Sequence, residues 1–235
     1  MFKTNSDTLN IMDKLEQLNL YMGIYMENNN DYFPKQYTFR ITGGEASWDN
    51  LFGAYDGRNL SDANFWAGEQ RTNKSSHCRP ATEIYKCPSE SIMNSFYFIQ
   101  NYALNRGGVG YGHDSDGKDA IGNWRCYGVV GYKVTRLTNP SKTICLAEMR
   151  GSWNVLGSRS NYADGPKAGT HNNFQPSRGD WGENFPPLHS SKWNYIFSDG
   201  HVECLDPYET VGKDAELPGM PYVMWAHQPC PNCFK

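Results

Sequence analysis

The chain has 235 residues, of which 38% are hydrophobic, and its formal net charge is −3. This length is enough to bury a sizeable core in one large domain or two small ones. The charge gives no electrostatic case for binding nucleic acid, and the longest apolar runs span only a few residues, too short to cross a membrane.

Residues 6–30 are predicted to form the one clear helix of the chain. Its apolar residues recur at intervals of three and four: Leu9, Met12, Leu15, Leu18, Met22 and Tyr25. A run of asparagines ends this pattern before Asp31, and Pro34 cannot continue a helix. We expect an amphipathic helix that packs on a sheet.

After residue 34 the sequence indicates short strands joined by long loops. No period is sustained over 35–80, where 49–55 can form one helical turn, and 105–123 and 150–187 are also expected to be loops. A strand, or two strands broken at Asn101, is predicted at 92–104. Further strands are predicted at 128–137, 143–149, 193–198 and 201–205. A helix followed by strands predicts the α+β class, with an antiparallel sheet. We therefore divide the chain into a helix, 1–34, and a loop-rich sheet domain, 35–235, within one structural unit.

The last two predicted strands form a hairpin whose turn is Asp199-Gly200, and His189 lies nine residues before that aspartate. Histidine beside aspartate can form a catalytic dyad, with the histidine as acid–base. We favour a structural role, because no serine or cysteine has the context of a nucleophile and Asp-Gly is ordinary turn chemistry.

The seven cysteines indicate an oxidising compartment, although an odd count leaves one unpaired. Cys78 and Cys87 are close enough in sequence to close a small disulfide loop. Cys230 and Cys233 can form a disulfide, a redox pair or, with His227, part of a zinc site that lacks a clear fourth ligand. The other three fall in apolar stretches and are predicted to be buried: Cys126, Cys145 and Cys204.

Asp114, Asp116 and Asp119 surround a glycine and resemble the start of a calcium-binding loop. A complete loop would have Glu at its twelfth position, where this chain has Arg125. We expect a solvated acidic loop and no cofactor, with a structural calcium ion as the alternative.

Seven tryptophans suggest a second class of function. Exposed tryptophans that stack on sugars would make the chain an extracellular carbohydrate-binding protein. Tryptophans in a loop-rich β domain more often fill the core, and we prefer that interpretation.

Several signals occur together in a familiar order. They are the helix that ends at Asp31-Tyr32-Phe33-Pro34, then Tyr85–Ser89, Asn101–Asn105, Asn139–Glu148, and the spacing from His189 to Asp199-Gly200. In this order they resemble the soluble part of prepilin-like proteins, the pseudopilin-like proteins of type II secretion. The C-terminal domain of those proteins is named for the same His-to-Asp-Gly spacing.

The resemblance implies a pilin-like fold and a non-enzymatic subunit of a type II secretion or type IV pilus-like system. It implies that the helix continues an apolar membrane anchor that is missing here, and that the sheet domain is extracytoplasmic, in the periplasm or at the cell surface. The partners would be other pilin-like subunits or the secretion machinery, while the isolated chain would be a monomer. His189, Asp199 and Gly200 would be structural hallmarks of the fold.

Overall fold

The structure is a computed structural model, and it contains two compact units. The first comprises Met1–Ala103 and Met149–Asn161, and the second comprises Leu104–Glu148 and Tyr162–Lys235. The structure describes residues 5–34, 37–39, 44–66, 79–91, 97–108, 126–127, 129–150, 155–157, 162–165, 189 and 192–210. Our expectation of a single structural unit divided at residue 34 stays a prediction.

The predicted helix is confirmed as α1 (Asn5–Asn28) in the first unit. The apolar positions whose burial the structure describes are buried at the predicted spacing, with Met12 partly exposed. The helix ends where Asn30 and Asp31 take positive φ values of 55° and 65°, a conformation that these short polar residues tolerate. The amide of Asp31 donates a hydrogen bond to the carbonyl of Met26, which closes the last turn.

Within the first unit, α1 packs against two short 3₁₀ helices, η1 (Asn50–Phe52) and η3 (Glu83–Tyr85). The ring of Phe52 lies 6.1 Å from that of Tyr25 and 5.5 Å from that of Trp48, so aromatic contacts form this part of the core. The predicted helical turn within 49–55 is thus confirmed as η1. This unit also contains an antiparallel pair, β1 (Tyr37–Phe39) and β2 (Gly44–Ala46), and two single-turn helices, α2 (Asp62–Phe65) and α3 (Arg79–Thr82).

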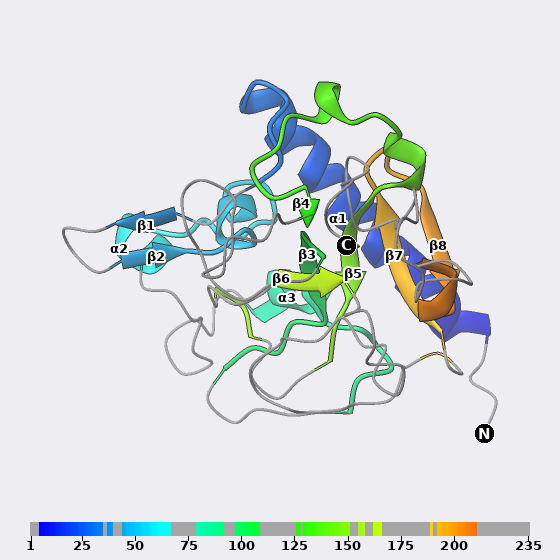
Figure 1. The fold of residues 1–235 in the computed structure, drawn as a ribbon. Coiled ribbons are helices and arrows are strands. Elements are labelled where there is room, and N and C mark those ends of the chain that lie inside the picture. Colours follow the sequence, from blue (N-terminus) through cyan, green and yellow to red (C-terminus); the bar gives the residue numbers. More distant parts are fainter. Residues whose placement is uncertain are drawn as a thin grey trace, which may run out of the picture. The chain divides into compact units, whose positions relative to one another are not determined.

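The second unit contains, from Leu104 onward, the strands of a six-stranded sheet. Its strands are β3 (Tyr102–Gly108), β4 (Cys126–Tyr127), β5 (Ile144–Glu148), β6 (Tyr162–Gly165), β7 (Trp193–Phe197) and β8 (Val202–Leu205). The order is β4-β3-β5-β7-β8, and β6 pairs with β3 (Figure 1). Three short 3₁₀ helices complete the described part of this unit: η4 (Val134–Arg136), η5 (Pro140–Lys142) and η6 (Pro207–Thr210).

The helix and the antiparallel strand pairs confirm the α+β class. The pairs β3–β4, β5–β7 and β7–β8 are antiparallel, whereas β6 runs parallel to β3, which the sequence analysis did not predict. The apolar run predicted at 143–149 forms β5, which is buried throughout, and β7 is buried throughout as well.

Two strand predictions were wrong in whole or in part. Of the strand predicted at 128–137, residues 129–137 are described and do not form a strand, because the chain turns at Gly131, which has a φ of 64°, and then enters η4. The amide of Val129 donates to the carbonyl of Asn105 at 3.0 Å, the residue opposite it in the register of β3 with β4, and the segment turns away from β3 after this contact. The strand predicted at 92–104 begins only at Tyr102 and extends to Gly108; residues 92–96 lie outside the described part.

Of the three cysteines predicted to be buried, Cys145 is buried, but Cys204 is exposed. Cys204 lies on β8, whose two central residues both face solvent, so the apolar alternation did not indicate a buried strand face there. Burial raises the pKa of the Cys145 thiol, which therefore stays protonated at neutral pH. The side chain of Cys126 lies outside the described part.

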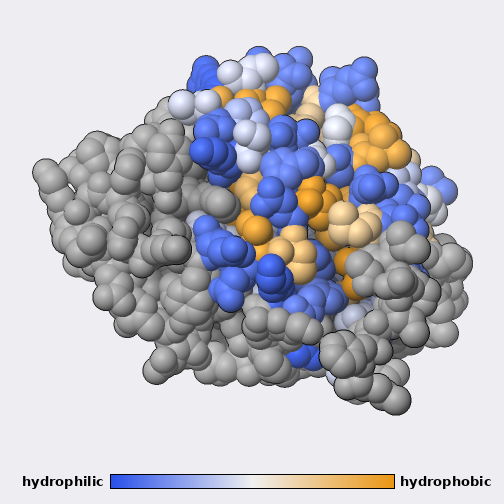
Figure 2. All heavy atoms as spheres, turned by 90° about the vertical axis from the view of Figure 1, so that its right-hand side faces the viewer, coloured by the Kyte–Doolittle hydropathy of each residue, from blue (hydrophilic) through white to orange (hydrophobic). Residues whose placement is uncertain are grey.

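The described surface carries few large hydrophobic side chains. Figure 2 shows hydrophobic residues interrupted by hydrophilic ones over the described part of one face. Among the described residues, Leu20 and Tyr32 are the exposed large hydrophobic side chains, at 58% and 43%. None of the described helices has the length and apolar character needed to span a membrane.

Candidate functional site

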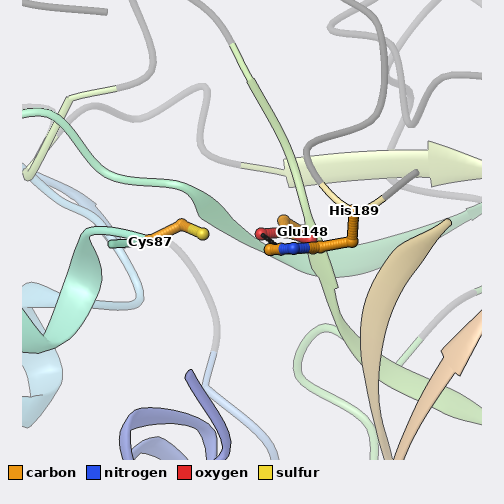
Figure 3. Close-up of side chains that lie close together, drawn as sticks. All are labelled: Cys87, Glu148 and His189. Carbon is orange, nitrogen blue, oxygen red and sulfur yellow. Dashed lines mark hydrogen bonds and ion pairs between the residues drawn. The ribbon is translucent and has the colours of Figure 1, made fainter. Parts of the chain in front are cut away.

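The structure places His189 beside Glu148 at the end of β5. Nε2 of His189 lies 3.0 Å from Oε1 of Glu148, and Figure 3 shows the two side chains pointing toward each other. The Glu148 side chain is completely buried, while that of His189 is 15% exposed. This contact is a hydrogen bond when the imidazole is neutral and an ion pair when it is protonated.

The second oxygen of Glu148 binds the start of β7. Oε2 accepts hydrogen bonds from the backbone amide of Asn194 at 3.1 Å and from its side-chain amide at 3.2 Å. A buried carboxylate requires such donors, because each buried polar group left without a partner costs about 1–3 kcal/mol of stability. Glu148 therefore joins β5, β7 and the segment at His189, and its burial keeps it from solvent.

Asp199 and Gly200 form the turn between β7 and β8, as predicted. Gly200 has a φ of 94°, which favours glycine, and its amide donates to the carbonyl of Phe197 at 2.9 Å. Oδ1 of Asp199 lies 2.5 Å from Nδ1 of His201 and accepts from the His201 amide at 3.3 Å. The His201 ring stacks on the ring of Phe197, with the two ring centroids 4.3 Å apart.

The hypothetical dyad of His189 and Asp199 is therefore not formed: among the described residues, no hydrogen bond or ion pair joins the two. His189 is bound to Glu148, and Asp199 is bound to His201. Glu148 stands at the end of one of the sequence motifs, but neither it nor His201 was predicted to have a role. The acidic residue at the end of a buried strand was the available signal for Glu148.

Asn101, in another of the motifs, connects four segments of the first unit. Its side chain accepts from the amide of Cys87 and donates to Oε2 of Glu90, both at 2.9 Å. Its backbone amide donates to the carbonyl of Tyr85, and its backbone carbonyl accepts from the amide of Met149. Arg150 also reaches Glu90, with Nη2 2.9 Å from Oε1, so this buried carboxylate is charge-paired as well as hydrogen-bonded.

Asn105, in the same motif, has a comparable role in the second unit. Its side chain donates to the carbonyl of Ile144 at 2.7 Å, and its own carbonyl accepts from Val129. Thr143 and Ser198 join the start of β5 to the end of β7, because the amide and hydroxyl of Ser198 both donate to the Thr143 carbonyl. The motif residues thus satisfy backbone groups that would otherwise be buried without partners.

A second cluster of charged residues lies inside the first unit. The Arg58 guanidinium contacts Asp49, with Nη1 3.3 Å from Oδ2, and Asp56, with Nε 2.6 Å from Oδ2. The hydroxyl of Tyr85 donates to Asp56 at 2.6 Å, and the Arg58 guanidinium lies over the Tyr85 ring. All four side chains are buried. The sequence analysis did not predict this cluster.

The remaining predicted sites fall outside the described residues. These are Asp114, Asp116 and Asp119 of the calcium hypothesis, and Cys78, Cys230 and Cys233 of the disulfide hypotheses. Cys87 is described and buried, but its expected partner, Cys78, is not described. The calcium and disulfide assignments stay predictions.

No protein-family model, curated protein or solved structure matches this chain.

Proposed function

We propose that the chain is the extracytoplasmic part of a non-enzymatic, pilin-like subunit of a type II secretion or type IV pilus-like system. One observation carries the proposal: the residues of the motifs that suggested this family bind backbone or buried carboxylates within the fold. His189 binds buried Glu148, Asp199 and Gly200 form a turn, and Asn101 and Asn105 connect separate segments. This use is the one expected of motifs that are structural hallmarks.

In the proposed subunit, the two faces of α1 have different roles. Its buried side chains anchor it within the first unit, whereas Glu16, Gln17, Leu20 and Glu27 are exposed and available to a partner. In the proposed subunit, an apolar segment ahead of α1, about twenty residues long, holds the protein in the inner membrane. The sheet unit then faces the periplasm or the cell exterior, and other subunits bind through the helix.

The described tryptophans do not favour the carbohydrate-binding alternative. Trp48 and Trp193 are buried, at 0% and 1% exposure, so neither offers a ring to a sugar. Trp66 is half-buried and packs edge-on against Phe65, with ring centroids 4.8 Å apart. These are the three tryptophans that the structure describes.

The test compares the product of the complete native reading frame with the chain that begins at Met1, both expressed with a secretory route to the periplasm. We expect the native product to remain in the membrane fraction after an alkaline wash, and the shorter chain to be released in the aqueous fraction. A native product that is also released, or a native start at Met1, would contradict the anchored subunit.

A further inference from the structure

The buried cluster of the first unit contains more acidic than basic groups. Two carboxylates, Asp49 and Asp56, share the single guanidinium of Arg58, and all three side chains have no exposed surface. With both carboxylates ionised, the described cluster would hold one uncompensated negative charge. Burying such a charge is costly, and a buried group commonly avoids this cost by binding a proton.

No other described basic group faces the cluster. Tyr85 reaches it from η3, and the pKa of Tyr21 of α1 is raised by burial first and then by the negative charge of Asp56. Lys14 of α1 directs its ammonium group elsewhere, to the backbone carbonyls of Glu83 and Lys86 at 2.7 and 3.0 Å. The uncompensated negative charge is therefore removed only if one of the two carboxylates binds a proton.

Arg58 makes its shorter ion pair with Asp56, at 2.6 Å compared with 3.3 Å for Asp49. Oδ2 of Asp56 accepts from Arg58 Nε and from the Tyr85 hydroxyl, both at 2.6 Å, and Oδ1 of Asp56 accepts from the Arg58 amide at 2.9 Å. Three donors, one of them the charged guanidinium at close range, therefore surround the Asp56 carboxyl group.

Asp49 has weaker support for a negative charge. Its Oδ2 accepts from the Gly157 amide at 2.9 Å and lies 3.3 Å from Nη1 of Arg58. Nη2 of Arg58 donates to the backbone carbonyl of Asp49. Oδ1 of Asp49 accepts from the Ser47 hydroxyl, and that hydroxyl can rotate to accept a hydrogen bond from a protonated carboxyl group instead. Burial raises the pKa of Asp49 by more than Arg58, Ser47 and Gly157 lower it.

We propose that Asp49 is a proton-binding site that stabilises the first unit in acidic surroundings and weakens it as the pH rises. The proton sits on Oδ1 of Asp49 and is donated to Oγ of Ser47, leaving Arg58 and Asp56 as a balanced pair. When the pH rises, this proton leaves to solvent and the cluster acquires a net negative charge. This inference goes beyond the proposed function and does not depend on it.

The direction of the pH dependence follows from linkage. The pKa of Asp49 is higher in the folded chain than the value of about 3.9 in an unfolded chain, so the folded state binds more protons above that pH. The resulting stabilisation is complete below the unfolded pKa and is lost as the pH rises through the folded one. An ordinary ion-paired aspartate would behave in the opposite way.

The test is Asp49→Asn in the full chain, because asparagine reproduces the protonated carboxyl. Its side chain can still accept from Gly157 and donate to Ser47. We expect the melting temperature of D49N to exceed that of the wild type at about pH 7.5, and the difference to narrow steadily as the pH is lowered to about 4. A D49N chain that melts below the wild type with a difference independent of pH would overturn the proposal.

Asp56→Asn is the matched control, since it removes the charged partner of Arg58; it should lower the melting temperature at every pH in this range. A direct measurement on the wild type covers the case in which D49N does not fold. The carboxyl carbon resonance of Asp49 should titrate above the pKa of about 3.9 that an aspartate has in an unfolded chain. Titration of Asp49 at or below about 3.9 would overturn the proposal.

Discussion

A single side chain, that of Asn101, holds together parts of the first unit that are distant in sequence. It is fully buried and binds Cys87 and Glu90, while its backbone binds Tyr85 and Met149. Replacing it by alanine leaves one buried amide and one buried carboxylate oxygen with a partner fewer. At this scale the motif residues act as substitutes for backbone hydrogen bonds where the chain has no regular ladder.

We therefore expect Asn101→Ala to lower the free energy of unfolding by about 1–3 kcal/mol, measured by chemical denaturation. The control is Asn28→Ala, which removes one exposed hydrogen bond at the end of α1 and should change stability by about 0.5 kcal/mol or less. Equal effects of the two substitutions would show that Asn101 has no special structural role.

At the scale of elements, the helix and the hairpin owe their positions to different physical signals. The spacing of three and four residues in α1 is local, as are the alternation and turn dipeptide of β7 and β8, so both could be predicted from the sequence. Strand β6 has four residues and exists through pairing with β3, and no local pattern specifies that pairing. The same holds for the contact of His189 with Glu148, which are separated by 41 residues.

Two glycines allow a test of how the first unit packs around its helices. A methyl group added at Gly23 of α1 meets nothing within 4 Å, so Gly23→Ala should stabilise the protein by about 0.5–1 kcal/mol through helix propensity. At Gly53 the same methyl group would lie 2.7 Å from Cδ1 of Leu60, so Gly53→Ala should destabilise it. If chemical denaturation shows that Gly53→Ala has a higher free energy of unfolding than Gly23→Ala, this account of the packing is contradicted.

At the scale of the whole molecule, composition and patterning predicted the class of fold but not its buried charges. The α+β class and the central position of β5 followed from the apolar pattern. The cluster of Asp49, Asp56 and Arg58 did not, because charged residues in sequence normally indicate surface, and only the fold brings these together in the interior. The motif of His189 and Asp199-Gly200 was recognised, but its partners Glu148 and His201 were not.

The proposed subunit also implies an oligomeric state for the chain of 26.7 kDa. In the proposed subunit, assembly depends on the apolar segment ahead of α1, so the chain without that segment is expected to be a monomer. Sedimentation equilibrium should give a monomer. A stable oligomer at micromolar concentration would contradict this expectation.

The central claim is that His189 of the family motif is structural, because it binds a buried carboxylate. The most direct measurement compares the unfolding free energies of His189→Ala and His201→Ala, since His201 is a more exposed histidine of the adjoining hairpin. We predict a loss of about 1–3 kcal/mol for His189→Ala, which leaves Glu148 Oε1 without this partner, and a smaller loss for His201→Ala. A His189→Ala chain that is as stable as the wild type would contradict the account.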